Sequence, residues 1–171
     1  FRLGVLRYSH LNAALCDKGK IMNEEQLETS KQDCILKMVE VLSSFQRIER
    51  SLKDDINLKY DLIRQYVDGR TPFHHRIEKS LPLGGLVEHL ERLSDDKDLI
   101  ASLRKMAKYR NEIAHERFLL VSESRDIEDI NRTYKWLTGL DNELTEWFIN
   151  HSTDRIKTMH KSVITHVDKV T

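Results

Sequence analysis

Apolar residues along this chain recur at helical spacing almost throughout. Between residues 23 and 53 they fall at steps of three and four, which places them on one face of an α-helix. No segment alternates apolar and polar residues as a half-buried β-strand does. The pattern therefore predicts an all-α fold, an antiparallel up-and-down helical bundle of about five main helices. Further helices are predicted over residues 56–67, 83–93, 97–121, 123–150 and 153–170.

Polar residues that favour helix ends set the predicted boundaries. Asp54-Asp55 is expected to separate the first two helices. Ser94-Asp95-Asp96 is expected to cap the helix that begins at Lys97, and Ser152-Thr153-Asp154 to start the last helix. These positions divide the chain into helices of ordinary length.

Residues 69–82 form the one long stretch without helical spacing. Both prolines lie here, and several side chains are basic, among them Arg70 and Arg76. A connection this long in a compact bundle is often functional, although a solvated crossover loop accounts for it equally well. Local RNA contacts through Arg70 and Arg76 are one expectation.

The first residues differ in charge from the rest of the chain. Residues 1–21 have more basic than acidic side chains, and Met22-Asn23-Glu24 resembles a natural start followed by a helix N-terminus. We therefore hypothesise that residues 1–21 are a leader or extension outside the core, and that residues 22–171 form a single helical domain. Loss of folding on deletion of residues 1–21 would contradict this hypothesis.

Composition narrows the classes of function. With 28 basic and 28 acidic residues the formal net charge is zero, so no global field attracts nucleic acid and any contact with it must be local. Cys16 and Cys34 do not form a metal-type pair, and only two thiols in a chain of this length indicate a reducing compartment. No apolar window is long enough to cross a membrane, so we expect a cytoplasmic protein without membrane contact.

Histidines and tryptophans suggest two further kinds of site. His74-His75 and His89 lack the cysteines or acids that would complete a metal site, so neither a metal nor another cofactor is expected. Trp136 and Trp147 are interpreted as packing anchors, because two aromatics on one helix do not make a base-stacking surface.

One cation interrupts the apolar face of the predicted helix over residues 97–121. Arg110 falls near the middle of that face, where an unpaired charge is costly, so it needs a carboxylate, a second subunit or an anion. Glu49 and Asp141 are the two candidate partners. His115 follows five residues later, which is about 140° around the axis, at the edge of the face.

Polar side chains accompany His115 on one ridge of this helix. Asn111 lies one turn before His115, and Arg104 and Lys108 precede it on the same side. A neutral imidazole acts as a general acid or base near pH 7, and an Arg stabilises charge developing at phosphorus. Together they suit metal-independent attack of a ribose 2′-OH on its neighbouring phosphate. On the residues alone, a structural salt bridge and a histidine at a helix–helix edge remain the alternative.

The segment Arg110-Asn111-Glu112-Ile113-Ala114-His115 resembles the R-N-x-x-A-H form of the Arg-x4–6-His signature of HEPN domains. The segment Leu81-Pro82-Leu83-Gly84-Gly85-Leu86-Val87 is similar to the turn that precedes this helix in several HEPN groups. Leu103, Met106 and Tyr109 match the apolar positions before the signature. The specific match covers about residues 80–120, and the bundle architecture covers residues 23–150 more loosely.

The resemblance implies a fold, a reaction and residue roles. HEPN domains are helical bundles found in prokaryotic toxins, phage-defence proteins and RNA-processing factors. Those that are ribonucleases act without metal, and their Arg–His helices meet in a cleft shared by two protomers. His115 would be the acid/base, Arg110 would stabilise the transition state, and Asn111 would be the polar residue after the Arg. Arg104 and Lys108 would contact RNA.

Two functions follow from this resemblance. The first is a homodimeric, metal-independent endoribonuclease, a toxin or phage-defence effector with a cognate antitoxin or another protein as partner. The alternative is a non-catalytic HEPN domain that binds RNA, a nucleotide or a protein partner.

Overall fold

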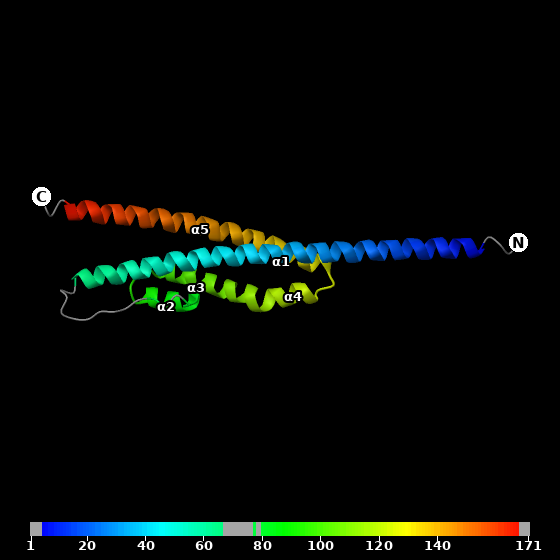
Figure 1. Ribbon diagram of the computed structural model, residues 1–171, viewed down its shortest axis with the longest axis horizontal. Helices are drawn as coiled ribbons and strands as arrows, with labels where there is room; N and C mark the ends of the chain where they lie inside the picture. The colour runs from blue at the N-terminus through cyan, green and yellow to red at the C-terminus, as the bar shows by residue number, and fades with distance from the viewer. Residues whose placement is uncertain (1–4, 67–76, 78–79, 168–171) are drawn as a thin grey trace.

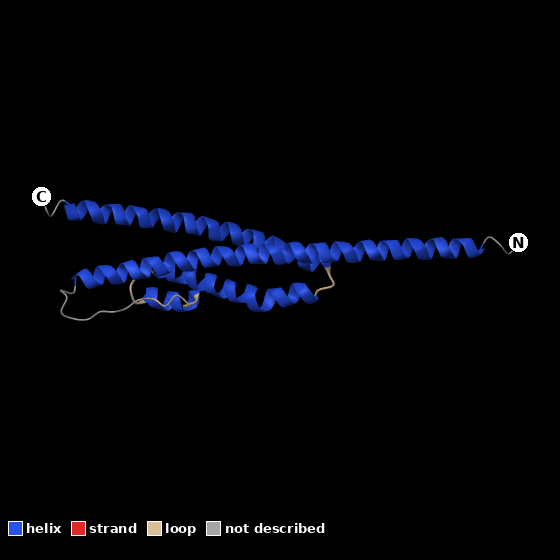
Figure 2. Ribbon diagram, viewed as in Figure 1, coloured by secondary structure: helices blue, strands red, loops and turns tan. Residues whose placement is uncertain are grey.

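The computed structural model describes residues 5–66, 77 and 80–167, and side chains within residues 24–64, 77 and 80–153. Each regular element in these ranges is helical, which confirms the predicted all-α class (Figures 1 and 2). The elements are α1 (Val5–Tyr66), α2 (Leu83–Glu91), α3 (Lys97–Glu112), the π-helical turn η1 (Ile113–Arg117), α4 (Phe118–Glu123) and α5 (Ile127–Val167).

The long helical runs alternate in direction along the chain. Figure 1 shows α3, η1 and α4 running back along α1, after which α5 again follows the direction of α1. Cys34 Sγ lies 3.9 Å from the carbonyl oxygen of Ile130, and Asp55 Oδ2 lies 2.7 Å from His151 Nε2. Because residue numbers rise together in these pairs, α1 and α5 pack in parallel.

The predicted break at Asp54-Asp55 is wrong, because α1 continues through it to Tyr66. The apolar face of α1 continues through this point at steps of four residues, with Leu52, Ile56 and Tyr60 all buried. Asp55 turns toward α5 and pairs with His151. The expected helix start near Asn23 is also wrong, since α1 begins at Val5.

The predicted break at residues 152–154 is wrong as well, because α5 runs through it to Val167. The hydroxyl of Thr153 donates to the carbonyl oxygen of Ile149 at 2.8 Å, one helical turn earlier. This bond satisfies the side chain without ending the helix. The predicted cap of α3 is confirmed, since Asp96 Oδ1 accepts from the Leu99 amide at 2.9 Å.

The predicted irregular connection over residues 69–82 lies mostly outside the described residues. Ile77, which is described, is buried, and its amide donates to Asn57 Oδ1 of α1 at 3.2 Å. The chain then enters α2, which packs against α1 and α3.

One face of α1 forms the floor of the hydrophobic core. This face is covered by α2, by the inner side of α3 and η1, and by the facing side of α5. Burial of each large side chain contributes about 1.5–3 kcal/mol. The largest fully buried side chains are Phe45, Met38, Ile48, Leu52, Ile56, Leu83, Leu86, Leu103, Ile113, Ile130, Leu137 and Leu144.

Candidate functional site

The helical run that carries the Arg–His segment changes its winding at the histidine. Residues 113–117 form a single π-helical turn between α3 and α4, and His115 lies at its centre. A π turn closes its hydrogen bonds over five residues instead of four, so it holds one extra residue. Such turns are rare in proteins, and those that occur are often found at functional sites.

The extra residue changes the direction in which the end of this run faces. Ile113 and Val121 are both buried, although eight residues separate them. In an unbroken α-helix that spacing would turn Val121 about 80° away from Ile113, whereas one residue absorbed in the turn leaves about 20°. The π turn therefore brings Val121 close to the angular position of Ile113.

Arg110 is paired with Glu49, one of its two predicted partners. Its Nε lies 3.9 Å from Glu49 Oε1, and its Nη1 donates to Asn111 Oδ1 at 3.3 Å. The Arg110 side chain is 34% exposed, so it borders the core and also reaches solvent. The predicted pairing with Asp141 is wrong, because that carboxylate binds Lys37 at 2.8 Å.

Glu49 joins the two segments on which the resemblance rests. Its Oε1 also accepts from the backbone amide of Leu83, the first residue of α2, at 3.3 Å. Pro82 before it offers no side-chain cap, so a carboxylate is well placed at this helix N-terminus. No local sequence signal indicates this role, because Glu49 is 34 residues from Leu83.

His115 and Asn111 are exposed on the outer side of the run. Among the residues with described side chains, His115 has no hydrogen bond or ion pair. The imidazole is therefore open to a ligand or to another protein. Because a π turn rotates less per residue, it also lowers the angle between Arg110 and His115 below that of an unbroken α-helix.

Beyond Ile113, only Val121 of the apolar face predicted for this run is buried. Ala114 and Phe118, both expected on the packed face, are exposed. The reason is the extent of α2, which packs against α3 while η1 and α4 continue past it (Figure 1).

The predicted RNA-binding residues differ in what surrounds them. Arg104 is exposed and pairs with Glu91 of α2 at 2.8 Å, which compensates its charge within the chain. Lys108 is also exposed. Arg70, Arg76 and the predicted His74-His75 pair lie outside the described residues. His89 is half-buried, and its Nδ1 lies 3.2 Å from the Tyr60 hydroxyl.

An ion pair and two rings surround the other side of the π turn. Arg117 Nε and Nη2 donate to Glu112 Oε1 at 2.8 and 2.6 Å. The guanidinium lies over the Trp136 ring at 4.9 Å, and Tyr109 meets that ring edge-on at 5.9 Å. Both tryptophans pack against the core as predicted. The sequence did not reveal the Glu112–Arg117 pair, because five residues of α-helix would separate them by about 140°.

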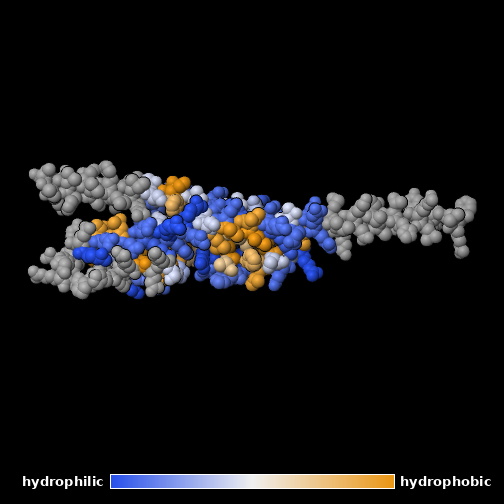
Figure 3. Space-filling model, in the orientation of Figure 1, coloured by the Kyte–Doolittle hydropathy of each residue, from blue (hydrophilic) through white to orange (hydrophobic). Residues whose placement is uncertain are grey.

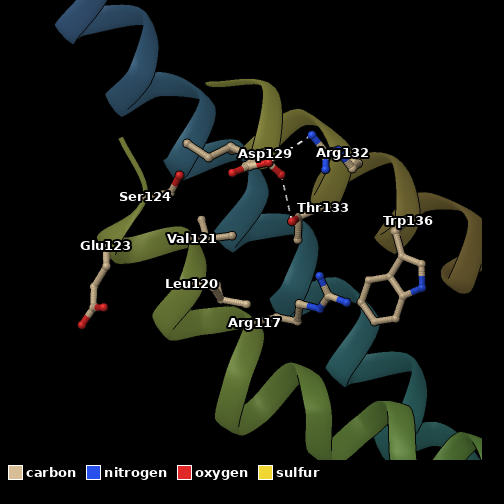
Figure 4. A pocket seen from close by; sticks show the side chains of 10 residues that line it. Arg117, Leu120, Val121, Glu123, Ser124, Asp129, Arg132, Thr133 and Trp136 are labelled. Atoms are coloured by element: carbon tan, nitrogen blue, oxygen red, sulfur yellow. Dashed lines mark hydrogen bonds and ion pairs between the residues drawn. The ribbon is translucent and has the colours of Figure 1, made fainter. Parts of the chain in front are cut away.

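This cluster borders a cavity of about 620 Å³ between α4 and α5. Figure 4 shows the Arg117 guanidinium pointing toward Trp136 at one end of the cavity, with Asp129, Arg132 and Thr133 on the α5 side. Leu120 and Val121 contribute apolar surface from α4.

Exposed apolar residues lie on α1 and on α4, and those of α4 begin three residues after His115. We call this the α1–α4 apolar surface: Leu36 and Val39 of α1 with Phe118, Leu119 and Leu120 of α4, each between 48% and 63% exposed. The two helices pack against each other, and Figure 3 shows apolar atoms where they lie side by side. A contiguous apolar patch of this kind marks an interaction site.

The fold and this site define an all-α protein whose helical run presents an exposed histidine and an ion-paired arginine around a π turn. Comparisons with models of protein families, with curated proteins and with solved structures find no match to this chain. The resemblance to HEPN domains therefore rests on the quoted segments.

The described part of the chain contains no cluster of three or more His, Cys, Asp or Glu side chains arranged to hold a metal ion. None of its helices has the length and apolar character to cross a membrane. Cys34 is buried in the core, and this burial raises the pKa of its thiol.

Proposed function

We propose that the protein is a metal-independent endoribonuclease of the HEPN type, with a HEPN-like bundle and a composite active site at a homodimer interface. The observation that carries the proposal is the arrangement around Glu49. Its carboxylate joins the Leu-Pro-Leu-Gly-Gly turn to Arg110, while His115 stays exposed on the same helical run. A role as toxin or phage-defence effector, with an antitoxin or other protein partner, is part of the proposal through the resemblance.

The chemistry assigned to the site is transfer within the RNA backbone. The 2′-oxygen bonds to phosphorus as the bond from phosphorus to the 5′-oxygen breaks, leaving a 2′,3′-cyclic phosphate and a 5′-hydroxyl. His115 accepts the 2′-OH proton, and a second His115 from the partner protomer protonates the leaving oxygen. Arg110 stabilises the negative charge on the phosphoryl oxygens.

The environment of Arg110 suits this role. Its ion pair with Glu49 is long, at 3.9 Å, and runs through Nε. Because the side chain is a third exposed, the outer guanidinium nitrogens are accessible to a phosphate. Glu49 then orients Arg110 without enclosing it.

The α1–α4 apolar surface supports a second copy of the chain as the partner. Its α4 part begins at Phe118, three residues after His115, and no element among the described residues covers it. Pairing through this surface would bring two His115 side chains toward one cleft.

A second candidate function has its own support. Arg104 is compensated by Glu91 and Arg110 by Glu49, and the chain has no net charge, so its general attraction for RNA is weak. These facts weigh against RNA cleavage, and so they support the alternative, a non-catalytic HEPN domain whose ligand is RNA, a nucleotide or a protein.

Cleavage of mixed RNAs in the presence of a chelator separates the two functions. Wild type should cut, His115→Ala should cut at least about 100-fold more slowly because a general acid–base is lost, and Glu116→Ala should match wild type. Glu116 is the control because it is exposed on the same turn. Equal cleavage by wild type and His115→Ala, or no cleavage by either, would contradict the endoribonuclease proposal and favour the non-catalytic binding domain.

A further inference from the structure

The ion pair between Glu112 and Arg117 depends on the π turn. Glu112 ends α3 and Arg117 ends η1, so five residues separate them. Five residues of α-helix put two side chains about 140° apart, whereas the five-residue rings of a π turn bring them to the same side. The observed contacts of 2.8 and 2.6 Å therefore require the wider winding.

A third residue fixes the same guanidinium from α5. Trp136 lies under Arg117 at 4.9 Å, and Tyr109 from α3 meets the indole edge-on. The Arg117 and Glu112 side chains are 34% and 22% exposed, so the pair is partly shielded from water and stronger than a surface pair. An Arg suits this place because a planar guanidinium stacks on a ring while its edge binds a carboxylate.

We propose that Glu112, Arg117 and Trp136 form a clamp that holds the π turn and thereby sets the direction in which His115 leaves the helix. They are positioning residues, since they lie on the α5 side of the run and His115 is exposed on its outer side. The effect on RNA cleavage rests on the proposed function, whereas the effect on the turn does not.

Deleting Glu116 tests whether the turn holds one removable residue. The deletion leaves Arg117 four residues after Glu112, so the pair can form in ordinary α-helix, and Val121 keeps its core face. We expect an unfolding midpoint within a few degrees of wild type, with shifted His115 imidazole signals and lost RNA cleavage.

Deleting Lys108 is the matched control. Lys108 is also exposed, but it lies in α3, so its loss rotates Ile113 and Val121 by about 100° relative to Leu103. We expect a sharp fall in the unfolding midpoint. If the Glu116 deletion lowers the midpoint as far as the Lys108 deletion, the proposed clamp is wrong.

Substitution of Arg117 tests the effect on His115 directly. In NMR spectra of histidine-labelled protein, assigned with His115→Ala, Arg117→Gln should move the His115 signals, and Arg117→Lys should restore them in part. The kcat of cleavage should fall about tenfold or more in Arg117→Gln with KM unchanged. Arg132→Gln, which removes an exposed arginine from the same cavity, should change neither.

The outcomes distinguish the clamp from the proposed function. Unmoved His115 signals in Arg117→Gln would overturn the clamp. If Arg117→Gln moves the His115 signals but wild type does not cut RNA, the proposed clamp is supported and the proposed endoribonuclease function is contradicted. If Arg117→Gln does not fold, the Glu116 deletion still decides the question.

Discussion

Carboxylates between helices determine which cations of this protein are held in place. Asp141 of α5 accepts from Lys37 at 2.8 Å and from the Ser44 hydroxyl at 2.9 Å, both on α1. The hydrogen bond from Lys37 lowers the pKa of the Asp141 carboxyl and raises the pKa of the Lys37 ammonium. Glu49 is thereby left as the carboxylate beside Arg110.

Asp141→Asn should destabilise the protein in a pH-dependent way. Because the folded pKa of Asp141 is lowered, its contribution is present above the unfolded pKa of about 3.9 and is lost as the pH falls through the folded value. At pH 7 we expect a loss of about 1–2 kcal/mol in the free energy of unfolding, measured by denaturant titration. Near pH 3 the difference from wild type should shrink.

Glu143→Gln is the control for this substitution. Glu143 also pairs with a lysine, Lys105, at 2.8 Å, but both side chains are about half exposed. We expect no measurable change at either pH. An equal loss from both substitutions, or a loss from Asp141→Asn that persists at pH 3, would contradict this account.

Single residues of the site were predictable from the sequence, but their partners were not. Arg110 and His115 stood out because one interrupted an apolar face and the other followed at a motif spacing. Periodicity places a residue on a face without telling which helix approaches that face. Which of Glu49 and Asp141 pairs with Arg110 depends on the parallel register of α1 and α5. In this register Asp141 forms an ion pair with Lys37 of α1, and Glu49 pairs with Arg110.

At the scale of elements, tertiary contacts override local signals for helix ends. Asp54-Asp55 and Ser152-Thr153 favour helix ends locally, yet Asp55 pairs with His151 and Thr153 bonds to its own helix. The π turn was also beyond the sequence pattern. Val121 lies 18 residues, or five full α-helical turns, after the buried Leu103, so the spacing of apolar residues also fits an unbroken α-helix.

The start of α2 offers a test of local packing. A Cβ added at Gly85 would lie 2.8 Å from Leu81 Cδ1, whereas one added at Gly84 would meet nothing within 4 Å. Gly85→Ala should be less stable than Gly84→Ala by about 1 kcal/mol, because Leu81 must move from its packing. Gly84→Ala should match or exceed wild type, since Ala favours helix over Gly. Equal unfolding midpoints for the two variants would contradict this packing.

At the scale of the whole molecule, the length of one short helix shapes the surface. α2 covers part of α3 and stops, so η1 and α4 keep an open flank next to α1 (Figure 1). The all-α class was predictable from periodicity alone. The open flank was not, because it depends on where α2 sits and not on any pattern within α4.

The α1–α4 apolar surface predicts a change of oligomeric state. Leu119→Lys places a charge where 55% of the side chain is exposed, next to the proposed cleft. In light scattering coupled to size exclusion we expect a wild-type dimer and a shift of Leu119→Lys toward monomer, since an unpaired buried charge is costly.

Ile149→Lys is the matched control, because Ile149 is 58% exposed on α5. It should remain dimeric, with helical content equal to that of Leu119→Lys by circular dichroism. A wild type that is monomeric at every concentration, or a Leu119→Lys variant that stays dimeric, would contradict the proposed interface.

The chemistry of the RNA ends tests whether Arg110 and His115 catalyse transfer within the RNA backbone. RNA cut by wild type in the presence of a chelator can be analysed by mass spectrometry, with His115→Ala as the comparison. We expect 2′,3′-cyclic phosphates and 5′-hydroxyls that are absent with His115→Ala. Products with 5′-phosphates and 3′-hydroxyls, or cyclic phosphates formed equally by His115→Ala, would contradict the roles of Arg110 and His115.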